Sequence, residues 1–395
     1  MQPEYFKKYI NRKFLLAIAG ISFFVLGSIY VFKNQNFNNF YSNSEKIIKA
    51  ENILTNVKAA TTLDTLDYDK KLEKLANKPI PKPVSVEPVV TPAKKHKSKG
   101  KNSLDKSAIA PTVTAKPAPV VKSLWPVKTA YPKIGALLPF KRIIAYYGNF
   151  YSKKMGVLGE YPEKEMLAKL KEEVKRWEQA DPETPVLPAI DYIAVTAQGY
   201  AGKDGLYRLR MPDNQVERAL ELAQKIDGIV ILEIQPGLSS FLKEVKYYEK
   251  YLKMPNVHLA LDPEFNMKTK VKPGKVIGAV DASEINQVAE YLAGLVRENN
   301  LIPKVLIVHR FTNPMVTNYK LIKPLPEVQI VMDMDGWGFQ AKKINTYLRV
   351  IYKEPVQFTG FKLFYKHDKR QPNSRLLTPE EILKLEPRPS FIQYQ

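Results

Sequence analysis

Short apolar runs recur along residues 142–365, and most of them end in polar or charged side chains. Stretches with helical spacing lie between them, such as 162–177, 214–226 and 282–300. Strand-like runs that alternate with helical ones predict a parallel sheet with crossover helices, and eight of them predict a β/α barrel. The expected strands are 142–147, 189–197, 229–235, 258–264, 276–280, 304–310, 328–335 and 359–365.

We therefore expect an α/β fold for residues 135–395, a (β/α)8 TIM-like barrel. Only residues 265–275 separate the fourth expected strand from the fifth. A parallel crossover usually needs a dozen or more residues and a helix. The barrel is therefore expected to lack one crossover helix or to have an irregular fifth strand.

Several expected strands end in carboxylates and amides. In a β/α barrel the strand bodies fill the core, and the C-terminal strand ends carry the chemistry. Alternate side chains of a strand share one face, so three strands each present two polar groups together. The pairs are Glu233 with Gln235, Asp262 with Glu264, and Asp333 with Asp335.

Crowded carboxylates raise some of each other's pKa values, so one can act as an acid while another stays ionised. This division of roles suits glycoside hydrolysis. We expect Glu264 and Asp333 to be catalytic, supported by Asp262. The structural alternative is that Asp262 caps a turn and that Asp333 and Asp335 organise a loop. The expected substrate-binding residues are Tyr146, Tyr147, Glu233, Gln235, His309, Arg310, Asp335, Trp337 and Lys362.

Other hydrolase chemistries have less support. Asp262, Glu264, Asp333, Asp335 and His309 could ligate a divalent cation, which keeps a metal-dependent hydrolase as an alternative. The chain has four histidines and no paired-histidine spacing, so no metal site is expected. It has no cysteine, no G-x-S-x-G elbow, no P-loop and no G-x-G-x-x-G motif, and no cofactor is expected.

The N-terminus predicts a membrane anchor. Residues 14–32 contain no charged side chain, and about 20 apolar residues cross a bilayer as a helix. Basic residues in the flank 1–13 favour a cytoplasmic N-terminus and place everything after Lys33 outside the cell. A cleaved signal peptide is the alternative, but the apolar run is long and lacks an A-x-A-like site. The expected location is the cell membrane, with a single pass and an extracellular C-terminal domain.

Residues 33–134 are expected to be a stalk and a Pro/Lys-rich disordered linker. The whole chain has a net charge of +21, and residues 1–134 carry 23 Lys and Arg against 9 Asp and Glu. The excess therefore lies mainly outside the barrel, which argues against nucleic acid as a partner. An extracellular basic segment would meet anionic lipid or an anionic cell-surface polymer, or would serve only as a solvated spacer.

Four blocks resemble a poorly characterised group of bacterial extracytoplasmic domains. They are residues 259–265, 277–286, 308–311 and 331–338. These domains are TIM-barrel-like and similar in layout to glycoside hydrolases, so the resemblance implies the fold and the location. The chitinase-type DxxDxDxE run is absent, because Gly336 and Trp337 follow Asp335.

The expected function combines these features. We expect a membrane-anchored, extracellular, glycosidase-like hydrolase domain that acts on a cell-surface or wall polysaccharide by carboxylate acid/base catalysis. The alternative from another class is a non-catalytic domain that binds a glycan or organises the envelope.

Overall fold

The computed structural model describes residues 62–76, 124–268 and 270–395. The expected flank 1–13, the expected transmembrane segment 14–32 and most of the expected stalk and spacer lie outside these residues. Within the described ranges, no helix has both the length and the apolar character that a membrane span needs.

Eight parallel strands form a closed barrel, which confirms the predicted TIM-barrel architecture. Each strand pairs with two neighbours, and the last one pairs with the first to close the ring. A ninth strand, β3 (Arg208–Arg210), pairs antiparallel with β2 at its end. In spatial order the barrel strands are β1 (Arg142–Gly148), β2 (Val186–Ala197), β4 (Ile229–Ile234), β5 (Val257–Leu261), β7 (Lys304–Arg310), β9 (Val328–Met334), β10 (Phe358–Leu363) and β11 (Phe391–Tyr394).

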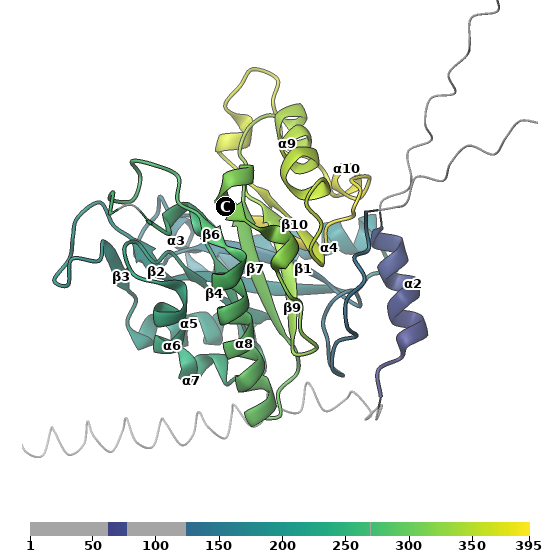
Figure 1. Ribbon diagram of the computed structural model, residues 1–395. Coiled ribbons are helices and arrows are strands. Elements are labelled where there is room, and N and C mark those ends of the chain that lie inside the picture. The colour runs from purple at the N-terminus through teal and green to yellow at the C-terminus, as the bar shows by residue number, and fades with distance from the viewer. Residues whose placement is uncertain (1–61, 77–123, 269) are drawn as a thin grey trace, which may run out of the picture. The chain divides into compact units, whose positions relative to one another are not determined.

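Helices connect most of the strands and cover the outside of the barrel (Figure 1). A capping box is present at the start of α8: the Glu284 carboxylate accepts the Asp281 N–H at 3.1 Å. The α-helices are α3 (Val157–Glu160), α4 (Glu163–Ala180), α5 (Asp213–Gln224), α6 (Phe241–Tyr247), α7 (Glu249–Leu252), α8 (Ala282–Glu298), α9 (Gln340–Tyr347) and α10 (Pro379–Ile382). Short 3-10 segments are η1 (Pro263–Phe265), η2 (Asn313–Met315), η3 (Tyr319–Leu321) and η5 (His367–Lys369), and η4 (Leu348–Tyr352) is π-helical.

The fifth strand predicted at residues 276–280 is not part of the barrel. Val276 and Ile277 are half exposed, and only β6 (Val280–Asp281) is extended. It pairs with β8 (Val316–Thr317) in a separate two-stranded sheet. This apolar run was too short to place from its pattern alone, and the structure uses it as a loop that leads into α8.

The strand numbering shifts as a consequence. β10, which was predicted as the eighth strand, is the seventh, and the C-terminal β11 completes the ring. The crossover without an α-helix is the one from β7 to β9, which contains η2, β8 and η3. One crossover does lack its α-helix, as predicted, but not the one that follows β5.

Inside the barrel, the half near the N-terminal ends of the strands is apolar. Its buried side chains alternate along each strand with those that face the surrounding helices. They include Ile143, Ala145, Leu187, Ala189, Ile229, Ile231, Ala260, Val305, Ile307, Val331, Phe358 and Phe391.

A helix from the expected stalk closes this end. α2 (Thr65–Leu75) inserts Tyr68, which is 3% exposed, into the apolar cluster. The Leu75 carbonyl accepts the Arg388 N–H at 2.8 Å just before β11, and Lys74 pairs with Glu183 just before β2. The folded part of the chain therefore includes α2, N-terminal to the expected boundary at residue 135.

Candidate active site

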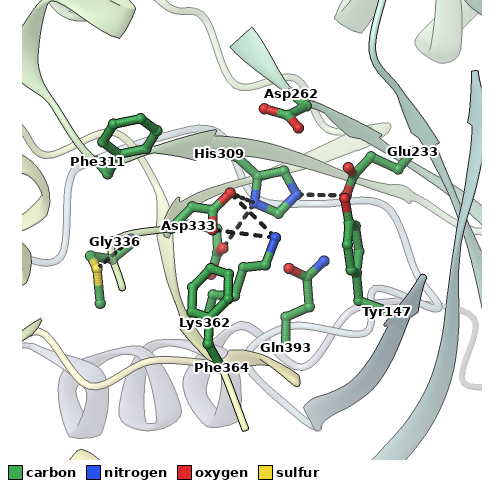
Figure 2. Close-up of polar contacts among 12 residues, drawn as sticks. Tyr147, Glu233, Asp262, His309, Phe311, Asp333, Gly336, Lys362, Phe364 and Gln393 are labelled. Atoms are coloured by element: carbon green, nitrogen blue, oxygen red, sulfur yellow. Dashed lines mark hydrogen bonds and ion pairs between the residues drawn. The ribbon is translucent and has the colours of Figure 1, made fainter. Parts of the chain in front are cut away.

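The half of the barrel interior near the C-terminal strand ends is polar. One buried acidic, basic or amide side chain comes from nearly every strand, because alternation continues upward from the apolar layers. They are Tyr147, Asp191, Glu233, Gln235, Asp262, His309, Asp333, Asp335, Lys362 and Gln393. Figure 2 shows several of them converging, among them Glu233, His309 and Lys362.

His309 lies at the centre of this group, between two carboxylates (Figure 2). Its Nδ1 is 2.9 Å from Asp333 Oδ2, and its Nε2 is 3.0 Å from Glu233 Oε2; all three side chains are fully buried. Burial alone would lower the pKa of His309, but the two acids raise it well above the usual value. Burial opposes ionisation of Glu233, yet the charge and hydrogen bond of His309 lower its pKa. The imidazole is therefore protonated at neutral pH.

Lys362 supplies the second buried positive charge. Its Nζ lies 3.2 Å from Asp335 Oδ1 and 3.3 Å from Oδ2, and 4.0 Å from the centre of the Tyr147 ring. Burial would lower the pKa of Lys362, but Asp335 and the neighbouring acids raise it. Burial raises the pKa of Asp335, and Lys362 partly offsets that rise. Asp335, which directly follows β9, is 8% exposed, whereas Asp333 within β9 is fully buried.

Gln235 connects the two neighbouring acids of β4 and β5. Its Nε2 lies 3.2 Å from Asp262 Oδ2, 3.3 Å from the Tyr147 hydroxyl and 3.5 Å from Glu233 Oε1. Burial and the charge of Glu233 raise the pKa of Asp262 well above its usual value. Burial and the charge of Glu233 therefore favour the protonated form of Asp262.

Two members of the cluster were missing from the sequence prediction. Asp191 of β2 and Gln393 of β11 are both buried, and Gln393 Nε2 donates to Asp191 Oδ2 at 2.6 Å. Burial and Glu233 raise the pKa of Asp191 well above its usual value. Alternation within 189–197 could have identified Asp191, whereas Gln393 lies in a strand that was not predicted.

Glu264 lies apart from this sealed network. η1 sets its position, because β5 ends at Leu261 and the alternation stops there. Its carboxylate is only partly buried and makes no hydrogen bond to the described residues. Burial and the charge of Asp335 raise its pKa, and Lys362 lowers it in part. Glu264 is thus a partly exposed acid whose pKa responds to the charge of Asp335.

Two predicted binding residues, Tyr146 and Arg310, lie on the outer face of the barrel strands and not in the cluster. The Tyr146 hydroxyl is hydrogen-bonded to the Tyr365 hydroxyl at 3.0 Å, among aromatic rings on the outer face of the barrel. Arg310 pairs with Glu354 at 2.6 Å and donates to the Asn313 carbonyl. Successive side chains of a strand face opposite sides. Tyr146 and Arg310 therefore face outward, whereas their neighbours Tyr147 and His309 face inward.

Gly360 makes room for the acid of the adjacent strand. A Cβ at this position would collide with Asp333 Oδ1 and lie 2.9 Å from Phe391 Cδ1. Asp333 Oδ1 is buried without a hydrogen-bond partner in the described part of the chain. The predicted catalytic Asp333 therefore fills an internal space below the mouth, with its other oxygen on His309.

Trp337 follows Asp335 by two residues and is 48% exposed. His367 packs edge-on against it, at 6.0 Å between ring centres, and stacks on Phe364. Since the Phe364 ring lies 5.2 Å from Lys362 Nζ, these contacts link the exposed tryptophan to the buried cluster.

No group of three acids and histidines is arranged to hold a metal ion among residues 62–76, 124–268 and 270–395. The acids instead contact His309, Lys362 and two amides. A small pocket lies at the opposite end of the barrel, lined by Leu72, Trp125 and Phe358 among others. It contains none of the cluster residues.

Comparisons with known proteins give structural neighbours only. No protein-family model and no curated protein sequence matches the chain. Solved structures similar to it include the cellulase Cel5C_n, at 13% identity and a TM-score of 0.32, covering 56% of this chain and 65% of that one. A Bacillus subtilis mannanase, man26, has 13% identity and a TM-score of 0.36, covering 65% and 79%. Thermotoga maritima Cel5A with cellobiose has 9% identity and a TM-score of 0.32, covering 65% and 88%.

These neighbours are glycoside hydrolase barrels, and the chain spans about two thirds of the first one's length. Because every TM-score given is below 0.5, neither their reaction nor their substrate is transferred to this chain. The chemistry proposed below is derived from the residues of the cluster.

Proposed function

We propose that the barrel domain hydrolyses a glycosidic bond of a cell-surface polysaccharide, with Glu264 as general acid and Asp335 as its ionised partner. The observation that carries the proposal is the contrast between these acids and the rest. Glu264 is partly exposed, and burial and the charge of Asp335 raise its pKa. Asp335 is fixed by its ion pair with Lys362.

The roles follow from the two environments. Glu264 stays protonated above the usual range of a glutamic acid and can donate its proton to the glycosidic oxygen as the bond to the anomeric carbon breaks. In its ionised form, which the ion pair with Lys362 favours, Asp335 attacks that carbon or takes a proton from the water that does. In the second step or in the direct displacement, the hydroxyl of water ends on the sugar.

The buried network positions Asp335 of this pair. Lys362 holds both oxygens of Asp335, and His309 Nδ1 lies 3.9 Å from Asp335 Oδ2. Glu233 and Asp333 in turn hold the imidazolium from both sides. We therefore assign Asp333 a positioning role and give the reacting role to Asp335.

The test is hydrolysis of extracted cell-surface polysaccharides by the full-length protein, measured as released reducing ends. Glu264→Gln and Asp335→Asn should each reduce the rate by about 10²-fold or more. Glu298→Gln is the matched control, an exposed acid at the far end of α8. Unchanged rates in both variants, with folding intact, would reject the proposal. The anomer formed first distinguishes attack by Asp335 from attack by water.

The proposed setting is the outer face of the cell membrane, supported by the apolar segment 14–32 and its basic flank. Protease treatment of intact cells tests this setting. Cleavage of the barrel domain only after lysis would overturn it.

A non-catalytic glycan-binding domain is the second candidate. It is favoured by the complete burial of Glu233, His309 and Asp333, whose charges are satisfied by each other. Polysaccharide binding without any release of reducing ends would support this candidate.

A further inference from the structure

An exposed aromatic ring flanked by cations lies at the rim of the barrel mouth. Trp337 is in the loop that follows β9, and Lys342 Nζ lies 4.3 Å from its ring centre. The Arg370 guanidinium lies 5.8 Å from the same ring. Lys342, Arg370 and the neighbouring Lys369 are all exposed.

These three cations have no acidic partner in the part of the chain that the structure describes. None of them forms an ion pair there, whereas Lys366 of the same loop pairs with Glu160 at 2.8 Å. The only acid in this loop, Asp368, is buried and pairs with Lys343 at 3.1 Å. The rim therefore presents positive charge that its own side chains do not neutralise.

The rim is held in place by buried contacts. Asp368 accepts the Gly338 N–H at 2.8 Å and the Phe364 N–H at 2.9 Å, which ties the loop after β9 to the loop after β10. Gly338 has a φ of +140°, and a Cβ there would lie 2.6 Å from Lys342 Cδ. The lysine stem thus lies along a glycine backbone, and this places its ammonium over Trp337.

We propose that the Trp337 rim, formed by Trp337, Lys342, Lys369 and Arg370, binds the anionic groups of the polysaccharide while the ring stacks on a sugar. An aromatic face offers apolar surface to a sugar ring, and flanking cations select a carboxylate or phosphate substituent. Trp337 is two residues from Asp335, so a chain bound at the rim would extend over the acid pair. The substrate is then an acidic polysaccharide. This inference rests on the proposed function for its substrate role, but its binding test does not.

The experiment measures binding of the full-length protein carrying Glu264→Gln, so that turnover does not intervene. Each anionic probe has a neutral match with the same backbone. Polygalacturonate is paired with its methyl ester, and phosphomannan with its dephosphorylated mannan. The two pairs distinguish a carboxylate from a phosphate as the recognised group.

Binding of at least one charged polymer should exceed binding of its neutral match. Adding Lys342→Gln and Arg370→Gln should weaken that binding by about tenfold and leave the neutral match unchanged. Lys141→Gln with Lys175→Gln is the control for net charge, since both lysines are exposed and lie near the N-terminal ends of the strands. This control should bind within about twofold of the parent, because exposed charges so far away are largely screened.

Equal loss in the rim and control variants would overturn the inference, because it would report only net charge. Equal binding of charged and neutral polymers, or binding of neither, would also overturn it. A rim that binds a charged polymer which the wild-type protein never cleaves would leave the inference standing and count against the proposed hydrolysis.

Discussion

The two halves of the barrel interior are built by the same strands with opposite chemistry. Near the N-terminal strand ends, inward side chains such as Ile143, Ile231 and Ile307 are apolar and lie under α2. Two to four residues further along, the inward positions become Tyr147, Glu233 and His309. A barrel can place acids in its interior only where cations and amides meet them, because an unpaired buried charge is very costly. The apolar half supplies hydrophobic burial, and the polar half supplies buried ion pairs and the candidate chemistry.

Removing the central cation should break the polar half most severely. His309→Gln leaves Glu233 and Asp333 buried without their shared partner, and we expect a loss of about 3–5 kcal/mol in the free energy of unfolding. His367→Gln is the matched control, since that ring is only partly buried. Urea unfolding measures both. A loss below 1 kcal/mol for His309→Gln would contradict the central role of the imidazolium.

The pH dependence of stability in wild type and His309→Gln gives a second test of the polar half. The pKa of His309 is raised on folding, so its contribution is fully present below about pH 6.5, the usual pKa of histidine. It is lost as pH rises through the folded-state value. The stability difference between wild type and His309→Gln should therefore shrink as the solution becomes alkaline. A difference that grows with pH would have the wrong sign.

Opening the apolar half should cost less than breaking the polar half. Tyr68→Ala removes the ring that α2 inserts under the barrel, and a loss of about 2–4 kcal/mol is expected. Leu66→Ala, on the exposed side of the same helix at 83% exposure, should change stability by less than about 0.5 kcal/mol. If the two variants unfold alike, α2 does not contribute to the closure of the barrel.

In acid, the smallest effect is expected where burial favours the neutral form of a carboxyl group. Asp262→Asn keeps the shape and can still accept a hydrogen bond from Gln235. Because the folded state holds the Asp262 proton and the unfolded state releases it, wild type loses stability above about pH 4 relative to the variant. The variant should match wild type in acid, and its advantage should grow by about 1.4 kcal/mol per pH unit above pH 4 until the folded-state pKa is reached. Strong destabilisation at pH 7 would show that Asp262 is ionised.

Much of the barrel was predictable because its strands are long and alternate with amphipathic helices. Seven of the eight predicted strand runs form barrel strands. The failures have local causes: residues 276–280 form a loop and the two-residue β6, which pairs outside the barrel with β8, and β11 has only four residues. The closing role of α2 had no signal in the pattern, because it depends on contacts of Tyr68 with the distant Tyr131 and Phe140.

The candidate site was predictable as far as alternation was applied. It correctly brought Glu233, Asp262 and Asp333 together, and its stricter use would have excluded Tyr146 and Arg310. The partners could not be predicted, because which acid meets His309 and which meets Lys362 depends on the register between strands. The exposure of each acid could not be predicted from the sequence either. Because Asp333 is fully buried and Asp335 is 8% exposed, we propose that Asp335 and not Asp333 reacts.

One measurement tests the proposed acid directly. Glu264→Gln is compared with wild type on the polysaccharide that the screen identifies and on a dinitrophenyl glycoside of the same sugar, whose leaving group needs no proton. We predict that the variant loses about 10²-fold or more on the polysaccharide and stays near wild type on the activated glycoside. Equal rates on the polysaccharide, or an equal loss on both substrates, would contradict Glu264 as the general acid.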